Sequence, residues 1–344
     1  MWSVLSTAGS GARAWNQVAW DGARVIVAGG ADGGGTYKND FATFENDTWT
    51  QRIPYVPTAE PVSREHQAVV YCPVDGKTWF FNGHTGTSAN SWATWDQRYR
   101  IWKTDGTAWE DTGGVAKQPE PGTDWNGNPM RMSAGTIWCP QMDGFLILGG
   151  ANWYPDRTYL LRRSDAKMER VLTTNSFAPG GMRFNVNNQA VWISELNKAA
   201  LFGGQDTTTN GKTYNELKVF DPATLTWANQ PTINPPPGRS EAAVVYRPGK
   251  IAVYGGINRE TSGGTTTKLA DFWELDIPTW TWTQLPDAPQ NAWFHGGAWD
   301  GTRYIFCAGF SDSGNGKTLT YTPSAVPGVQ IETPVSLIAE AIDA

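Results

Sequence analysis

The sequence predicts an all-β chain of six similar four-stranded units, and three repeated features support this. An apolar run that ends in glycine recurs, with its last glycine at positions 30, 83, 150, 204, 256 and 309. A short apolar strand ending in an aromatic residue precedes each run. An alternating strand and a Thr-Trp-type strand follow it. Helical periodicity is nearly absent, which disfavours an α/β fold.

The first two strands of each unit, a and b, are the most regular part of the repeat. Strand b is the apolar run, which ends in a Gly-Gly pair in four units and in degenerate copies at Asn82-Gly83 and Ala308-Gly309. Asp21-Gly22 and Asp300-Gly301 favour a two-residue hairpin between strands a and b. Strand a closes on an aromatic residue in every unit: Trp20, Tyr71, Trp138, Trp192, Tyr246 and Trp299.

The last two strands, c and d, predict how the chain closes. Strand c alternates, as in residues 216–220, and strand d carries Trp49, Trp109, Trp227 or Trp282, with Met168 in the third unit. The sixth unit has a strand c at residues 318–321 but no Trp strand after it. Residues 2–5 match the missing strand, so we expect the N-terminal strand to complete the last unit and remove the exposed sheet edges. Six such units closed in a ring predict a six-bladed β-propeller.

These repeats resemble the kelch family. The matching elements are the glycine pair after strand b, the aromatic that ends strand a, Asn39-Asp40 ahead of strand c and the Trp of strand d. The resemblance covers residues 2 to about 323. It implies a propeller and a short list of functions: intracellular protein-binding adaptors, secreted oxidases and sugar mutarotases.

The chain is expected to form a propeller at residues 1–324 and a tail at residues 325–344. The tail predicts a short apolar helix that is marginal alone and docks on the propeller or on an assembly partner. No apolar run is long enough for a membrane span, and the N-terminus lacks the pattern of a signal peptide, which together predict a cytoplasmic or virion-associated chain. A net charge of -6 disfavours nucleic-acid binding. Cys72, Cys139 and Cys307 are expected to be buried free thiols.

The predicted topology places long b–c and d–a connections on one face. The b–c loops span residues 31–41, 84–97, 205–215 and 257–270, and the longest d–a connection spans about residues 110–130. Long loops on a rigid scaffold commonly bind ligands, so we expect the functional site on this face.

Arginines mark the start of strand a, close to the axis on the same face. Arg13, Arg64, Arg131 and Arg239 each stand seven residues before the closing aromatic, and Arg183 stands nine before. They predict an electropositive rim suited to carboxylates, phosphates or sugar hydroxyls. The alternative is that they bond neighbouring carbonyls, Glu65 or Glu241 and brace adjacent blades.

Aromatic residues and histidines complete the candidate site. Trp92, Trp95, Trp125 and Trp153 fall in loops, and Trp15 and Trp293 fall near the axis, where an exposed indole stacks on sugars or partner side chains. Each could instead pack inward. His66 and His295 are expected near the mouth, hydrogen-bonded to neighbours rather than paired on a metal. No metal, cofactor or known catalytic motif is expected.

Three functions remain open from the sequence. The favoured one is a non-catalytic recognition propeller that binds a glycan or a partner protein, with a phage, virion or cell surface as a natural setting. The second is an enzyme resembling the kelch mutarotases, with Arg64, Glu65, His66, Arg239 and Glu241 as candidates for acid–base chemistry. The third is an intracellular adaptor that captures an acidic peptide on the arginine rim.

Overall fold

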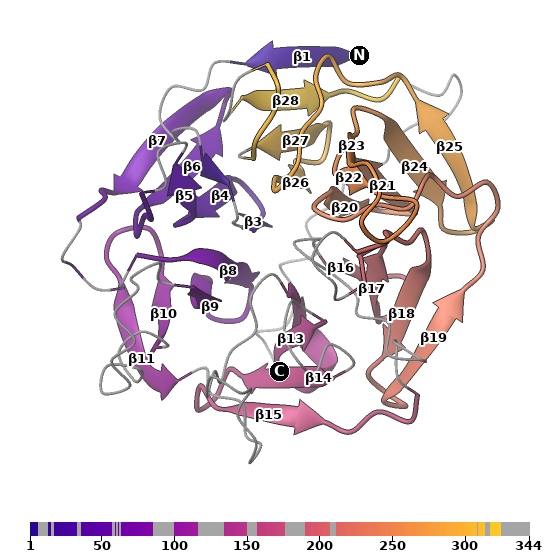
Figure 1. The fold of residues 1–344 in the computed structure, drawn as a ribbon. Helices are drawn as coiled ribbons and strands as arrows, with labels where there is room; N and C mark the ends of the chain where they lie inside the picture. Colours follow the sequence, from indigo (N-terminus) through magenta and orange to yellow (C-terminus); the bar gives the residue numbers. More distant parts are fainter. Residues whose placement is uncertain are drawn as a thin grey trace, which may run out of the picture.

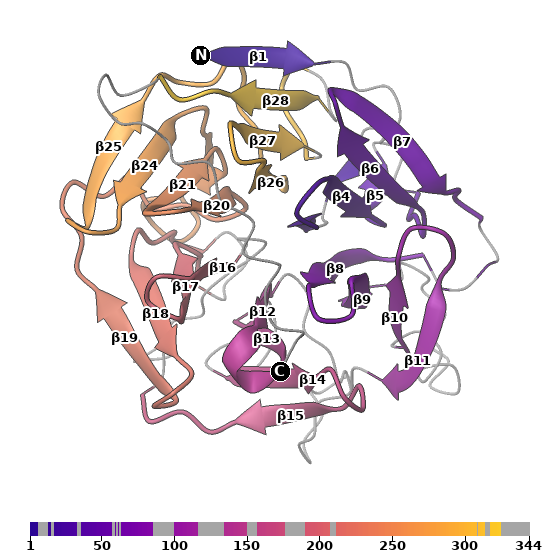
Figure 2. The same cartoon turned by 180° about the vertical axis from the view of Figure 1, so that it is seen from behind.

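The computed structural model is a ring of six four-stranded antiparallel sheets around a central axis, as Figures 1 and 2 show from its two sides. It describes residues 1–5, 13–14, 17–32, 36–56, 59, 61, 63–84, 100–115, 134–149, 157–175, 190–206, 211–307, 309–313 and 317–324, without the side chains of Ala14, Glu65 and His84. The predicted all-β, six-bladed propeller is confirmed.

Each of the first three blades contains four strands that pair in chain order. Blade 1 contains β3 (Val18–Trp20), β4 (Val25–Ala28), β6 (Phe41–Glu45) and β7 (Thr48–Ile53). Blade 2 contains β8 (Glu65–Cys72), β9 (Lys77–His84), β10 (Arg100–Thr104) and β11 (Glu110–Val115). Blade 3 contains β12 (Gly135–Cys139), β13 (Gly144–Leu148), β14 (Thr158–Arg162) and β15 (Met168–Val171), with a short 3-10 helix η2 (Pro140–Met142) between its first two strands.

The last three blades follow the same order. Blade 4 contains β16 (Val191–Ile193), β17 (Lys198–Phe202), β18 (Leu217–Asp221) and β19 (Thr226–Gln230). Blade 5 contains β20 (Ala243–Arg247), β21 (Lys250–Tyr254), β24 (Phe272–Asp276) and β25 (Thr281–Leu285). Blade 6 contains β26 (Gly296–Trp299), β27 (Tyr304–Cys307), β28 (Thr318–Tyr321) and β1 (Trp2–Leu5).

The N-terminal strand closes the ring as the sequence predicts. Strand β1 pairs antiparallel with β28, and Trp2 stands opposite Tyr321. The Met1 ammonium group donates to the Thr322 carbonyl at 2.5 Å. Figure 1 shows β1 outside β28 at the rim of the ring. The indole of Trp2 contacts the rings of Tyr254, Phe272 and Phe306, so the strand also joins blade 6 to blade 5.

The hydrophobic core consists of six clusters, one between each pair of neighbouring blades. Every cluster contains the strand-d aromatic of its second blade, or Met168 in blade 3. The Nε1 of Trp49 donates to Thr318 Oγ1 of blade 6 at 2.8 Å, and that of Trp227 donates to Thr158 Oγ1 of blade 3 at 2.8 Å. The strand-d Trp, or Met168 in blade 3, therefore packs each blade against the one before it.

Two of the b–c loops are more regular than the sequence suggests. In blade 1, β5 (Ala31–Asp32) pairs with β2 (Arg13–Ala14), the segment ahead of strand a. In blade 5, β22 (Ile257–Asn258) and β23 (Thr267–Lys268) form a second small sheet. The three cysteines are free and buried, as predicted.

Candidate functional site

The two faces of the ring carry different connections between strands. We call the face with the b–c and d–a connections the loop face, and the face with the a–b and c–d turns the turn face. Strand a runs from the loop face to the turn face along the axis in every blade, so its first residues lie at the axial mouth of the loop face. The predicted site belongs to this mouth.

The arginines at the start of strand a bond to their own blade through their side chains. Arg13 donates to the Gly29 carbonyl at 3.1 Å and to the two Asp40 oxygens at 2.7 and 2.8 Å. Arg239 repeats the arrangement with the Gly255 carbonyl at 3.0 Å and the two Asp271 oxygens at 2.8 and 2.7 Å. A planar guanidinium fork is well suited to this bidentate contact.

The backbones of the same residues bond to the preceding blade. The N–H of Gly204 in blade 4 donates to the Arg239 carbonyl at 2.7 Å, and the N–H of Gly309 in blade 6 donates to the Arg13 carbonyl at 2.5 Å. Gly204 and Gly309 have positive φ values of 113° and 84°, which explains the repeated second glycine. Each arginine thus joins two blades, an arrangement that we call the blade clasp.

The three described arginines all belong to the blade clasp. This agrees with the alternative that they brace adjacent blades. Arg13, Arg64 and Arg239 are 4%, 0% and 0% exposed, so they offer little surface to a ligand. In blade 2, Arg64 Nη1 donates to the Asn82 carbonyl at 3.2 Å. The clasp carboxylates are Asp40 and Asp271, not the predicted Glu241. Both aspartates directly precede strand c, a position that the Asn39-Asp40 motif already marks.

In blade 5, the Asp271 carboxylate of the clasp is held ionised by Arg239. Burial alone would raise the pKa of Asp271, but hydrogen bonds and charge from Arg239, with the Trp273 indole N–H at 2.7 Å, lower it. A buried pair that is fully hydrogen-bonded is costly to break, because one charge then remains without its partner.

The sixth unit has no arginine, and its histidine has a different role from the predicted one. Ala292 occupies the clasp position and accepts from the Gly256 N–H at 2.7 Å. His295 is 2% exposed and packs edge-on against Tyr254, with ring centroids 4.8 Å apart. Burial lowers its pKa to about 3, so the imidazole is neutral. The prediction that His295 faces the mouth is wrong: it lies in the core between blades 5 and 6.

Among the described residues, three follow the clasp at the mouth of the loop face: His66, Glu241 and Phe294. We call them the axial triad. Each stands two residues after its clasp position and has a left-handed φ, at 55°, 62° and 54°. The rings of His66 and Phe294 come from blades 2 and 6, yet their centroids are 6.1 Å apart. The Phe294 N–H donates to the Glu241 carbonyl at 3.0 Å. Left-handed backbone in non-glycine residues is strained and clusters at functional sites.

Glu241 is the chemically distinctive member of the axial triad. It is 6% exposed, and burial raises its pKa to about 8, which the nearby charge of Arg259 only partly offsets. At neutral pH the carboxyl group is therefore mostly protonated and able to donate a hydrogen bond. Perturbed carboxyl groups of this kind are frequent at functional sites.

Polar contacts organise the loop face around the triad in blades 5 and 6. Lys268 Nζ lies 4.3 Å from the ring centroid of Trp293 and 2.5 Å from Asp312 Oδ1. Asn291 Nδ2 donates to the other Asp312 oxygen at 2.8 Å. Trp293 and Phe310 also form an isolated β-bridge. This half-buried indole has a cation, the Lys268 ammonium group, over one side of its ring.

The loops of blades 4 and 5 are bonded to each other. The Thr213 N–H donates to the Arg259 carbonyl at 2.9 Å, and the Arg259 N–H donates to Thr213 Oγ1 at 2.9 Å. Arg259 Nη1 reaches Gln205 Oε1 at 3.1 Å, and Ser262 Oγ donates to Asp206 Oδ2 at 2.9 Å. The loop face here is a fixed surface rather than a set of independent loops.

Several predicted site residues lie outside the described part of the chain. They are Trp15, Trp92, Trp95, Trp125, Arg131, Trp153 and Arg183, and the side chain of Glu65 joins them. The tail at residues 325–344 is outside it as well. Their roles stay predictions.

Two features of the described residues bear on the remaining predictions. No group of three or more His, Cys, Asp or Glu side chains among them is arranged to hold a metal ion. The helices within the described ranges include none of the length and apolar character that crossing a membrane requires.

Comparison with known families identifies the repeat. Residues 187–323 match the Kelch-repeats domain model of KLHDC2, KLHL20 and DRC7. The matched segment contains all four strands of blades 4 and 5 and the first three strands of blade 6. It includes Arg239, Glu241 and Trp293.

Proposed function

We propose, from the premise that this chain is a six-bladed propeller of kelch repeats, that it is a non-catalytic binding module whose ligand docks on the loop face. Kelch propellers are typically binding modules and commonly take protein ligands. The ligand of this chain, by our proposal, is a partner protein or a glycan.

The observation that carries the proposal is the fixed, mixed-charge loop face around the axial triad. Lys212 and Lys268 are exposed there beside the acidic Glu260 and Asp312. Trp293 adds a half-buried aromatic beside Lys268. A rigid frame that presents an aromatic anchor and charges of both signs can bind without ordering its own loops, which lowers the entropic cost of association.

A screen with matched charge variants tests this proposal. The immobilised propeller is exposed to a glycan array and to a random peptide library, as wild type, as Lys212→Glu/Lys268→Glu and as Lys167→Glu. Lys167 is exposed in a c–d turn and so lies on the turn face. We expect a binder whose affinity falls at least tenfold in the loop-face variant and is unchanged in Lys167→Glu. A binder whose affinity is the same for the loop-face variant and for wild type would contradict the proposal.

One observation favours a second candidate, an enzyme resembling the kelch mutarotases. Glu241 with a pKa of about 8 could act as a general acid at neutral pH, and His66 belongs to the same triad. Exchange between sugar anomers measured by NMR tests it: the rate must exceed that of buffer and fall in Glu241→Gln.

The adaptor for acidic peptides has less support. Its predicted rim includes Arg13, Arg64 and Arg239, which the blade clasp buries. The setting at a phage, virion or cell surface rests on the sequence alone. An antibody against the propeller that labels intact particles would test it.

A further inference from the structure

The turn face opens into a cavity that the proposed function does not use. The cavity has a volume of about 340 Å³ and lies on the axis, lined by residues from the first strand of all six blades. It reaches from Gln17 and Thr136 to the last residues of these strands. Its volume falls in the range of small-molecule sites. We call it the axial cavity.

Six aromatic residues surround the axial cavity at its turn-face end, and we call them the aromatic collar: Trp20, Tyr71, Trp138, Trp192, Tyr246 and Trp299. They are the residues that close strand a in the sequence repeat. At the loop-face end, the rings of His66 and Phe294 lie with their centroids 6.1 Å apart, and neither residue is among the lining residues. The axial cavity and the loop-face mouth are therefore separate sites.

The wall of the axial cavity is uncharged. Its middle is formed by Val, Ala, Ile and Gly residues such as Val69, Val191 and Val244. The polar groups at its inner end bond to each other, since Gln17 Nε2 donates to the Ala134 carbonyl at 2.5 Å and Thr136 Oγ1 bonds Gln17 Oε1. None of the described lining residues carries a charge. A charged group placed here would lose its hydration without a partner.

The aromatic collar carries four indole N–H groups, and its rings pack against the blades. Each collar residue packs against a different one of the six clusters between blades. Trp299 also has the Arg247 guanidinium 5.2 Å from its ring centroid. Aromatic edges carry the positive end of the ring quadrupole, which attracts oxygen and repels cations. Within the described residues, no hydrogen bond uses the four indole N–H groups of the collar.

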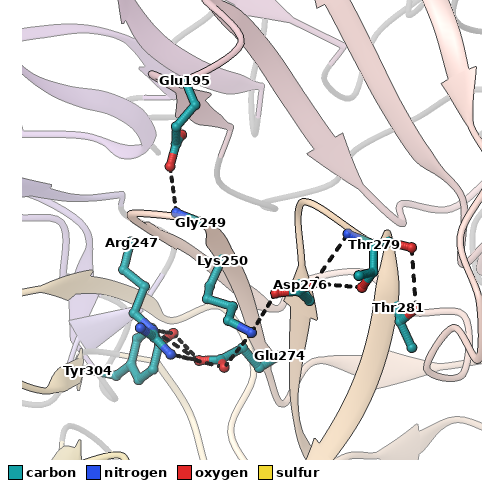
Figure 3. Close-up of polar contacts among 9 residues, drawn as sticks. All are labelled: Glu195, Arg247, Gly249, Lys250, Glu274, Asp276, Thr279, Thr281 and Tyr304. Atoms are coloured by element: carbon teal, nitrogen blue, oxygen red, sulfur yellow. Dashed lines mark hydrogen bonds and ion pairs between the residues drawn. The ribbon is translucent and has the colours of Figure 1, made fainter. Parts of the chain in front are cut away.

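Charged groups near the collar are already engaged, as Figure 3 shows for blades 4 to 6. Arg247 forms a two-pronged pair with Glu274, with contacts of 2.9 to 3.0 Å, and also donates to Tyr304 Oη at 2.7 Å. Glu195 accepts from the Tyr246 hydroxyl at 2.6 Å and from the Gly249 N–H at 2.5 Å. Neither group is available to neutralise a charged ligand in the axial cavity.

We propose that the axial cavity binds an uncharged small molecule with an apolar body and an acceptor oxygen at one end. The apolar body displaces water that the wall cannot hydrogen-bond, which is favourable. The oxygen stays at the aromatic collar, where it accepts from the free indole N–H groups. This site is independent of the loop-face ligand.

Three probes of equal shape and different charge test the proposal. They are 3-fluorobenzyl alcohol, 3-fluorobenzylammonium and 3-fluorobenzoate, titrated with the full chain and observed by fluorine NMR. We expect the alcohol to bind with a Kd on the order of 1 mM, as suits a probe of this size. Both ions are expected to bind at least tenfold more weakly. Equal or tighter binding of the ammonium ion, or no binding of the alcohol, would overturn the proposal.

A cavity-filling variant with a matched control locates the site. Ile137 lines the axial cavity, so Ile137→Trp should weaken binding of the alcohol at least tenfold. Ile233, which is 58% exposed and does not line it, gives the control Ile233→Trp with unchanged binding. Should Ile137→Trp fail to fold, Ser194→Trp at the exposed rim replaces it. Binding that survives in a folded cavity variant would refute the assignment.

Discussion

Replacing Glu241 by Gln should change how the stability of the propeller depends on pH. The carboxyl group is 6% exposed, and burial raises its pKa from 4.5 to about 8. The native state therefore holds this proton more tightly than the unfolded chain does. The amide of Gln is close in shape to the protonated acid and does not titrate, so Glu241→Gln removes this one contribution.

The sign and the size follow from the two pKa values. A group whose folded pKa is raised contributes stability at low pH, and that contribution is lost as pH rises through the folded value. At about 1.4 kcal/mol per pKa unit, the full effect is about 5 kcal/mol. About 3 kcal/mol of it disappears between pH 5 and pH 8. Glu241→Gln should thus gain about 3 kcal/mol relative to wild type across that interval.

Urea unfolding followed by tryptophan fluorescence at pH 5, 6, 7 and 8 measures this difference. Glu260→Gln serves as the control, because Glu260 is exposed on a neighbouring loop, and it should follow the wild-type curve. If the free energies of unfolding of Glu241→Gln and wild type ran parallel from pH 5 to pH 8, the assignment of a buried, protonated carboxyl group to Glu241 would be wrong.

Four further variants test the frame of the ring, each by its free energy of unfolding in urea. Asp271→Asn leaves Arg239 buried without its carboxylate and should cost about 3 kcal/mol, a loss that a wild-type-like midpoint would contradict. Trp2→Ala removes the aromatic contact of the closing strand and should cost about 3 kcal/mol; an effect below about 1 kcal/mol would show that β1 does not hold the ring. Gly249→Ala places a Cβ at φ 74° with no atom within 4 Å and should cost about 1 kcal/mol. Gly256→Ala also places its Cβ 2.5 Å from a carbonyl oxygen and should cost at least about 2 kcal/mol more. A larger cost for Gly249→Ala than for Gly256→Ala would contradict this reasoning.

The sequence alone predicts the blades and the closing strand because these depend on local patterns. Alternation, the glycine pair and the repeated Trp each fall within one unit. The missing strand d of blade 6 is complemented by residues 2–5 at the opposite end of the chain. The predicted register even places Trp2 with the strand-d aromatics of the other blades. Such patterns fix which segments are strands and how many blades they form.

Side-chain direction is harder to predict, as the arginines illustrate. Spacing places Arg13 and Arg239 at the loop-face end of strand a, but it leaves open whether they point to solvent or into the blade. Their carboxylate partners stand 27 and 32 residues later in the sequence, beyond strand b and a variable loop. His295 was misplaced for the same reason, since its orientation depends on packing against Tyr254.

The axial cavity could not be predicted because it is a property of the assembled ring. Each collar aromatic has an evident structural role, and the sequence interpretation of Trp20 or Trp299 as repeat architecture is consistent with its packing. Only the closed ring brings six such residues around one volume. Residues that repeat for structural reasons can thus form a site together, because the symmetry of the ring places them around one cavity. No local sequence motif marks such a site.

The closing strand also sets an order on synthesis. Residues Trp2–Leu5 are synthesised long before their partner β28, which is more than 300 residues away, as the Met1–Thr322 contact with its separation of 321 residues shows. Blades 1 to 5 can form from neighbouring segments while translation continues. Until β28 is made, β1 has no partner within the ring, and its indole stays exposed to chaperones and to other chains. Contacts of such sequence separation form slowly. Closure of the ring by β1 therefore has to wait until β28 has been synthesised.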